Sequence, residues 1–295
     1  MVIDKKINLN DIEINFKKNY LLQAECYYLK EIKKYNIKHY LILLGFGLVC
    51  RFKEKLKGDS NIKLSKKIME LNMNSDKSIT SVDGHKLDIY IAEAKKDSKL
   101  GLVIIQEIFG VNSHIRDVCD SFANIGLTSI APALFDRSEP GLELNYETAD
   151  IEKGRSLKTE IGWDDPLKDI NSSINFLRER NFLKIGIIGY CWGGSLAFLA
   201  ACRSNADAVV GYYGGQIIDF VDEKPSCPTM LHFGSKDSSI PLSDIKTISE
   251  KHPNVGVYVY EGAGHGFNCN KRADYDSNAS KKALSRTIEH LKEHM

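Results

Sequence analysis

The pattern of apolar and polar residues becomes orderly after about residue 75. Two strand-like runs, 78–82 and 86–92, flank Asp83 and Gly84. This pair is typical of a tight hairpin turn, because the turn requires a positive φ. The next run, 100–106, is apolar throughout, as expected of a strand buried on both faces.

Farther along the chain, short apolar runs alternate with segments of helical periodicity. Strands are predicted at 127–131, 183–189, 208–213, 229–234 and 255–261, and helices at about 113–125, 145–157, 166–180, 194–203, 241–251 and 275–293. Ser113 is expected to cap the first helix, and Gly126 to end it. The alternation predicts an α/β fold with a mostly parallel sheet and helices on both faces. Catalytic groups in such sheets gather at the carboxyl ends of the strands.

The first 72 residues differ from the rest in charge and pattern. They hold 15 Lys or Arg against 8 Asp or Glu, whereas the remainder holds 25 against 31. The apolar run 40–50 is too short to cross a membrane, which takes about 20 residues. We expect residues 1–72 to be a basic extension that is poorly ordered, helical, or upstream of a true start at Met69 or Met73. Residues 73–295 are expected to form the α/β domain.

The acidic balance of this domain argues against binding to nucleic acid, and no membrane association is expected. Seven cysteines, an odd number without a CxxC pair, predict neither a disulfide framework nor a metal site. Reduced thiols are typical of a cytoplasmic protein. We expect no cofactor, and a monomer or weak homo-oligomer.

One cysteine lies in a segment that suggests chemistry. Residues 189–194 read G-Y-C-W-G-G between a predicted strand and a predicted helix. This is the pattern of a nucleophile elbow, G-x-S-x-G, with Cys191 in place of serine. The elbow requires small residues beside the nucleophile, and the helix N-terminus favours a thiolate. A buried structural thiol is the alternative, whereas a phosphate-binding loop would need a Lys-Ser/Thr pair that is missing.

Two further residues follow predicted strands in the order that a catalytic triad requires. Asp237 comes after the strand 229–234, and His265 comes after the strand 255–261. The order nucleophile, acid, base is that of α/β-hydrolases. A turn or capping role for Asp237 and a plain loop position for His265 stay open at this point.

Four separated motifs now resemble the dienelactone hydrolase family over residues 75–295. They are Q-E-I-F-G-V at 106–111, G-Y-C-W-G-G, G-S-K-D at 234–237 and G-A-G-H-G-F at 262–267. The resemblance implies an α/β-hydrolase fold and carboxymethylenebutenolidase-like activity. It also implies that Glu107 faces Cys191 in the resting enzyme and helps to control its thiol–thiolate state.

The expected reaction is hydrolysis of a small lactone or ester through a thioester on Cys191, with His265 as base. The backbone N–H groups of Ile108 and Trp192 are expected to form the oxyanion hole. A general carboxylesterase or thioesterase with an apolar acyl pocket is the alternative. A non-catalytic binding protein and a redox-sensing role for Cys191 are two further interpretations.

Substrate recognition departs from the resembled family. That family has a serine directly after the catalytic histidine and an arginine four positions after it. This chain has Gly266 and Cys269 there. Arg137 and Arg272 are candidate replacement cations for binding substrate, and Trp163 and Tyr212 are candidate pocket residues.

Overall fold

The computed structural model describes residues 78–95 and 98–295. The basic extension expected at 1–72 lies outside these residues, so its role and the domain boundary at 73 stay predictions. Among the described residues, no helix combines the length and the apolar character needed to cross a membrane.

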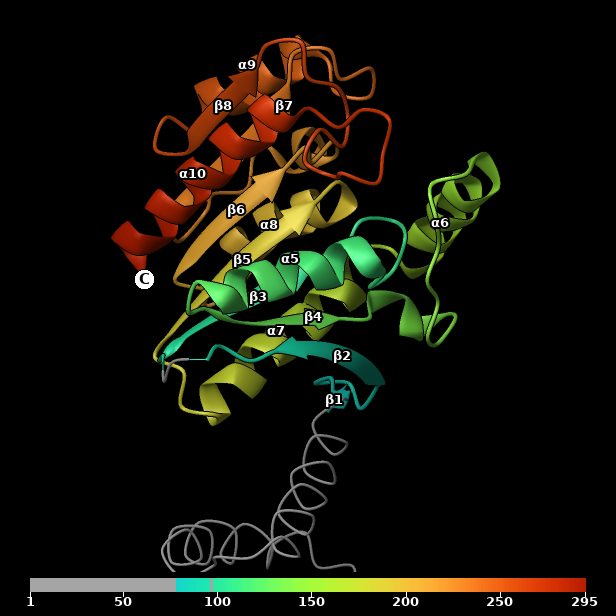
Figure 1. Ribbon diagram of the computed structural model, residues 1–295, viewed down its shortest axis with the longest axis vertical. Helices are drawn as coiled ribbons and strands as arrows, with labels where there is room; N and C mark the ends of the chain where they lie inside the picture. Colours follow the sequence, from blue (N-terminus) through green and yellow to red (C-terminus); the bar gives the residue numbers. More distant parts are fainter. Residues whose placement is uncertain (1–77, 96–97) are drawn as a thin grey trace, which may run out of the picture. The chain divides into compact units, whose positions relative to one another are not determined.

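One eight-stranded sheet organises the described chain (Figure 1). Its strands are β1 (Ser78–Thr80), β2 (Lys86–Ala92), β3 (Leu100–Ile105), β4 (Thr128–Pro132), β5 (Lys184–Tyr190), β6 (Ala208–Tyr212), β7 (Thr229–Gly234) and β8 (Gly256–Tyr260). They lie in the order β1-β2-β4-β3-β5-β6-β7-β8; β2 pairs antiparallel with both β1 and β4, and all the other pairs are parallel. The mostly parallel sheet predicted from the alternation of strands and helices is confirmed.

The hairpin between β1 and β2 is also confirmed. Gly84 has a φ of +86°, and its N–H donates to the Ser81 carbonyl. The Asp83 carboxylate accepts the His85 N–H at 3.2 Å. The turn therefore depends on a short side-chain acceptor at Asp83 and on the absence of a Cβ atom at Gly84, as the Asp-Gly pair predicts.

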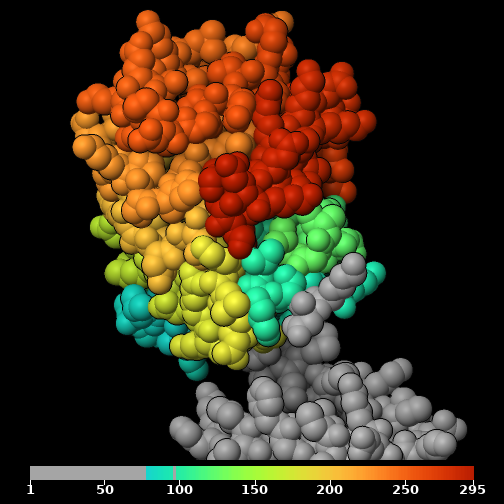
Figure 2. Space-filling view, turned by 90° about the vertical axis from the view of Figure 1, so that its left-hand side faces the viewer, coloured from blue at the N-terminus to red at the C-terminus, as the bar shows by residue number. Residues whose placement is uncertain are grey.

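Helices cover both faces of the sheet, as expected. They are α5 (Ser113–Asn124), α6 (Thr148–Ile161), α7 (Asp164–Glu179), α8 (Trp192–Arg203), α9 (Leu242–Lys251) and α10 (Ser277–His294), with 3-10 turns η1 (Leu134–Arg137) and η2 (Ile217–Phe220). Helices α5 and α10 pack on one face, and α7 and α8 on the other (Figure 1). Figure 2 shows α10 (red) at the surface, so only its inner side contributes to the core.

The N-cap of α5 corrects one prediction. Ser113 is already helical, and Asn112 caps the helix by accepting the Ile115 N–H on its side chain at 3.4 Å. The Asn112 amide also donates to the Leu144 carbonyl at 3.3 Å. Asn112 has the extended backbone of a cap and is buried among these partners, whereas Ser113 is exposed. The helix ends two residues before Gly126, whose φ is +101°.

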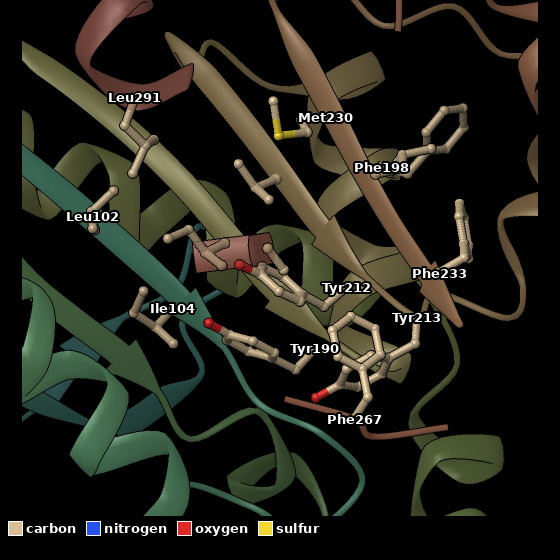
Figure 3. Close-up of a cluster of buried hydrophobic side chains, with 14 of the residues drawn as sticks. Leu102, Ile104, Tyr190, Phe198, Tyr212, Tyr213, Met230, Phe233, Phe267 and Leu291 are labelled. Carbon is tan, nitrogen blue, oxygen red and sulfur yellow. The ribbon is translucent and has the colours of Figure 1, made fainter. Parts of the chain in front are cut away.

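Alternate positions of the central strands supply the two halves of the core. Leu102 and Ile104 on β3 share one buried cluster with Tyr190 and Tyr212, the last residues of β5 and β6 (Figure 3). Val103 and Ile105 point into the other cluster. This period of two is what a strand buried on both faces imposes. The Tyr212 hydroxyl lies 2.6 Å from the Thr287 hydroxyl, which makes Tyr212 a core residue rather than a pocket wall.

Candidate active site

Cys191 lies on the sharp turn between β5 and α8. Its φ of 56° and ψ of −118° are rare for a residue with a side chain. Such a conformation costs on the order of 1–3 kcal/mol and persists only where neighbours hold it. The Cys191 N–H donates to the Tyr212 carbonyl at 3.0 Å, and its carbonyl accepts the Gly194 N–H at 2.9 Å. These bonds fix the strained turn at both ends.

The glycines of the elbow are explained by close backbone contacts. A Cβ atom at Gly189 would lie 1.9 Å from the Gly193 carbonyl oxygen. A Cβ atom at Gly193 would lie 2.4 Å from the Gln106 carbonyl oxygen. Both distances are impossible for carbon, so strand β5, helix α8 and the end of β3 can meet only because these side chains are absent. The elbow pattern in the sequence predicts this need for small residues beside the nucleophile.

The three residues predicted to form a triad meet at the carboxyl edge of the sheet. The His265 Nε2 atom lies 3.1 Å from the Cys191 sulfur, and its Nδ1 atom lies 2.7 Å from the Asp237 carboxylate. Asp237 follows β7, and its second oxygen accepts the Ser239 N–H at 2.8 Å. The aspartate side chain is fully buried and that of the histidine largely so. Asp237 therefore orients the His265 ring toward the sulfur.

The charges of this group favour a protonated imidazole. Burial alone lowers the pKa of His265. Negative charge on Cys191 and the Asp237 carboxylate outweigh burial and raise that pKa to about 10. The arrangement thus supports an imidazolium beside the Cys191 sulfur at neutral pH.

The two backbone N–H groups expected to form the oxyanion hole have no acceptor within the described part of the chain. Trp192 is the first residue of α8, where an N–H has no carbonyl partner within the helix. Neither its N–H nor that of Ile108 donates to another group among the described residues. Gly193 packs directly on the backbone of Ile105 and Gln106, which brings the end of β3 against the start of α8.

Glu107 is buried beside the triad but faces a different partner from the one expected. Its Oε1 atom lies 3.5 Å from the Arg272 guanidinium. Within the described chain it makes no hydrogen bond to Cys191, whose sulfur is engaged by His265. A contact between Glu107 and Cys191 in a resting form therefore stays a prediction.

Arg272 lies against the backbone of the residue that follows His265. A Cβ atom at Gly266 would be 2.8 Å from the guanidinium carbon. Arg272 also lies over the rings of Phe109 and Tyr146, at 5.8 Å and 5.9 Å from their centroids. The glycine in place of the family's serine thus leaves the room that this arginine occupies.

Arg137, the other candidate cation, is committed elsewhere. Its guanidinium lies 2.7 Å from both oxygens of the buried Asp169 and 3.1 Å from Asp83 in the β1–β2 turn. Asp165 is a further partner at 3.6 Å. Because these carboxylates already pair with the Arg137 guanidinium, we do not assign Arg137 a role in substrate binding.

Two residues beside Cys191 were missed by the sequence reasoning. Lys158 on α6 is half-buried, which lowers its pKa, and negative charge on Cys191 opposes that shift. Its ammonium lies 5.8 Å from the centroid of Trp163, which packs on Trp192. Tyr213 directly follows β6, and its ring centroid lies 5.3 Å from that of His265. Nothing in the sequence distinguishes Lys158 from other lysines on an amphipathic helix. Tyr213, in contrast, follows a central strand, and that position could have indicated that it lies at the site.

A mostly parallel sheet covered on both faces, with a strained elbow and an ordered Cys–Asp–His group at its carboxyl edge, defines an α/β-hydrolase. Comparison with known proteins narrows the class. The model of the dienelactone hydrolase family matches residues 87–295. The chain therefore belongs to the dienelactone hydrolase family, and it is a hydrolase of the ester and lactone class.

Individual relatives agree with this assignment. The carboxymethylenebutenolidase of Pseudomonas putida is 31% identical over 222 residues, which cover 72% of this chain and 94% of that protein. A Synechocystis protein provisionally named a carboxymethylenebutenolidase is 36% identical over 200 residues, which cover 62% and 81%. A solved Klebsiella pneumoniae structure provisionally assigned as a dienelactone hydrolase has a TM-score of 0.66 at 26% identity, covering 73% and 97%.

Proposed function

We propose that this protein hydrolyses a small lactone or activated ester through a thioester on Cys191. The observation that carries the proposal is the position of Cys191 at a strained elbow, 3.1 Å from a histidine that Asp237 orients. A structural thiol would need neither the strain nor the partner.

In the first step, the Cys191 thiolate attacks the carbonyl carbon and forms a carbon–sulfur bond. The carbonyl oxygen takes the negative charge and accepts hydrogen bonds from the N–H groups of Ile108 and Trp192. The tetrahedral intermediate collapses, the ester carbon–oxygen bond breaks, and the His265 imidazolium can protonate the leaving oxygen.

In the second step, water replaces the sulfur. Acylation removes the charge on Cys191 and leaves His265 neutral, so the imidazole can take a proton from the attacking water. Asp237 stabilises the imidazolium that forms. Collapse of the second intermediate breaks the carbon–sulfur bond and restores the thiolate, because a thiolate is a good leaving group.

The surroundings of the sulfur favour a substrate that carries a negative group. Burial lowers the pKa of Lys158, and negative charge on Cys191 opposes that shift. Burial acts in the same direction on Arg272, but negative charge on Glu107 and then on Cys191 outweighs it and raises the Arg272 pKa. Both cations are thus within electrostatic range of the reacting sulfur. Of the two, Arg272 is the substrate-binding cation that we propose from its place beside His265 and Gly266.

A general carboxylesterase or thioesterase with an apolar acyl pocket is the competing assignment. The aromatic group formed by Trp163, Trp192 and Phe220 is the feature that favours it. Initial rates on p-nitrophenyl acetate, an acyl-CoA and a carboxylate-bearing enol lactone would separate the two. The proposal predicts the highest kcat/KM on the lactone, and a preference for neutral acetate or acyl-CoA would refute that substrate assignment.

The mechanism is tested with Cys191→Ala and Cys191→Ser. Cys191→Ala is expected to lose at least about 10³-fold in kcat, because no covalent intermediate can form. Acid quenching of the parent enzyme during turnover of an activated ester should trap the acyl-enzyme, visible as added acyl mass on the peptide that contains Cys191. Normal turnover by Cys191→Ala, or acylation at a different residue, would rule the mechanism out.

A further inference from the structure

A second group of reactive side chains lies next to the triad and is not used by the proposed mechanism. Glu107 follows β3, His114 lies in the first turn of α5, and Cys269 lies in the loop after His265. The carboxylate oxygen, ring nitrogen and sulfur that these residues offer all lie within 4.8 Å of one another. All three side chains are buried.

Two of these atoms lack the partner that burial normally requires. The Oε2 atom of Glu107 and the Nε2 atom of His114 are both buried, and neither has a hydrogen-bond partner among the residues that the structure describes. The exposed fractions of the two residues are 1% and 4%. Leaving such groups unsatisfied costs roughly 1–3 kcal/mol each, and more for a charged group. Each of these residues also offers a ligand atom within 4.8 Å of the Cys269 sulfur, and this proximity points to a ligand that all three bind.

The donor set matches a borderline-soft divalent cation. Imidazole nitrogen, thiolate sulfur and carboxylate oxygen are the ligands of zinc, whereas calcium and magnesium prefer oxygen alone. Burial lowers the pKa of His114, which keeps its ring neutral and able to bind metal. Burial also raises the pKa of the Cys269 thiol to about 11, so metal binding must release that proton to water.

The distances require only side-chain adjustment. Zinc bonds of about 2.0–2.3 Å in a tetrahedron place neighbouring ligand atoms about 3.3–3.8 Å apart. The ligand atoms lie within 4.8 Å of one another, so each pair must approach by at most on the order of 1 Å to bind zinc. The oxygen of Glu107 that would bind is the unpartnered one, so its other oxygen can stay beside Arg272.

We propose that Glu107, His114 and Cys269 form a zinc site beside the active site. The fourth position is filled by water or by the Tyr146 hydroxyl, which lies 3.3 Å from the Cys269 sulfur. One carboxylate and one thiolate balance the charge of Zn²⁺, so the filled site is neutral. Arg272 then keeps Asp274, 4.0 Å away, as its other anionic neighbour.

Cobalt provides the test, because Co²⁺ substitutes for zinc and a cobalt–thiolate bond absorbs in the near ultraviolet. The full chain carrying Cys191→Ala is titrated with Co²⁺, which removes the nucleophile as a competing ligand. We expect one Co²⁺ per chain with a sulfur charge-transfer band, and displacement of that band by Zn²⁺.

Paired variants in the same background locate the sulfur. Cys269→Ser should abolish the band, whereas Cys227→Ser, a half-buried thiol in the loop before β7, should leave it unchanged. His114→Gln should weaken Co²⁺ binding at least about tenfold but keep the sulfur band, and circular dichroism checks that each variant folds. No band in the Cys191→Ala chain, or a band that survives Cys269→Ser, would overturn the proposal. Neither result depends on hydrolytic activity, so the test stands apart from the proposed function.

Discussion

At the scale of single residues, the protonation of His265 depends on what its two ring nitrogens meet. A sulfur lies on one side and a buried carboxylate on the other, and both stabilise positive charge on the ring. The larger of these two favourable influences is the sulfur of Cys191. The protonation of the histidine therefore depends on the charge of the neighbouring sulfur.

Replacing Cys191 with alanine should lower the pKa of His265. The pKa is raised to about 10 in the parent, so the ring is protonated below that pH and loses its proton only above it. Without the sulfur charge, burial counts for more, and the ring should lose its proton at a lower pH than in the parent. NMR titration of the His265 ring measures this shift. An unchanged pKa would show that Asp237 alone holds the proton.

Gly266→Ala should move Arg272 away from its place. The new methyl group would lie 2.8 Å from the guanidinium carbon. Loss of a charge-assisted contact corresponds to roughly 1.5–3 kcal/mol, so we expect KM for a carboxylate-bearing lactone to rise about tenfold or more. Hydrolysis of a neutral ester should change much less.

Gly262→Ala is the matched control for this prediction. Gly262 has a φ of +81°, close to the +80° of Gly266, but a Cβ atom there would meet nothing within 4 Å. Both variants therefore carry the same backbone strain, and only one obstructs Arg272. An equal rise in KM in the two variants would attribute the effect to strain.

The positions of Cys191, Asp237 and His265 could be predicted because each follows a strand, and parallel strands end at one edge of a sheet. Arg272 could be predicted only as a candidate substrate-binding residue, because its position depends on the space left by the glycine at 266. Arg137 was an equal candidate in sequence. Its guanidinium is instead satisfied by Asp169, a residue that helical periodicity placed on α7 without indicating its partner.

At the scale of elements, the start of α5 depends on a single buried amide. Asn112→Ala should lower the free energy of unfolding by about 1–2 kcal/mol, because both the cap and the buried bond to Leu144 are lost. Ser113→Ala, one residue later and exposed, should change it by less than about 0.5 kcal/mol. Urea unfolding of the two variants measures the difference. The reverse ranking would restore Ser113 as the cap.

Most element boundaries were predicted within a few residues, and the differences have local causes. Helix α8 begins at Trp192 rather than at 194, because the Cys191 carbonyl already accepts the N–H groups of Gly194 and Ser195. Strand β3 ends at Ile105 rather than at 106. The Gln106 side chain instead accepts the Leu134 N–H at 3.1 Å, a contact 28 residues away that no local pattern shows.

At the scale of the whole molecule, Arg137 joins three separate parts of the described chain. It follows β4 in η1 and binds Asp83 in the β1–β2 turn and Asp169 on α7. Arg137→Met should lower the free energy of unfolding by roughly 3–5 kcal/mol, because the fully buried Asp169 loses its counter-charge. Lys153→Met, which breaks an exposed pair with Glu139, should change it by less than about 1 kcal/mol. Thermal or urea unfolding compares the two, and similar losses would contradict the assigned role.

The same group should make stability depend on acid. The hydrogen bond from Arg137 holds the pKa of Asp83 well below its ordinary value. A carboxylate with a depressed pKa stabilises the fold above its ordinary pKa of about 3.9, and the contribution is lost as the pH falls toward the folded value. The unfolding free energy of Arg137→Met should therefore fall less steeply below about pH 4 than that of the parent. If the unfolding free energies of the variant and the parent fall equally steeply below pH 4, the Arg137–Asp83 pair does not govern the loss of stability in acid.

The positive φ of Cys191 sets stability and chemistry against each other at one residue. Glycine adopts that conformation without steric strain, at a cost of about 0.5–1 kcal/mol in chain entropy, whereas the strain relieved is on the order of 1–3 kcal/mol. Cys191→Gly would thus be neutral or favourable for folding and fatal for a thioester mechanism. A population screened for heat resistance alone would drift toward glycine there, and only a requirement for turnover would retain the sulfur.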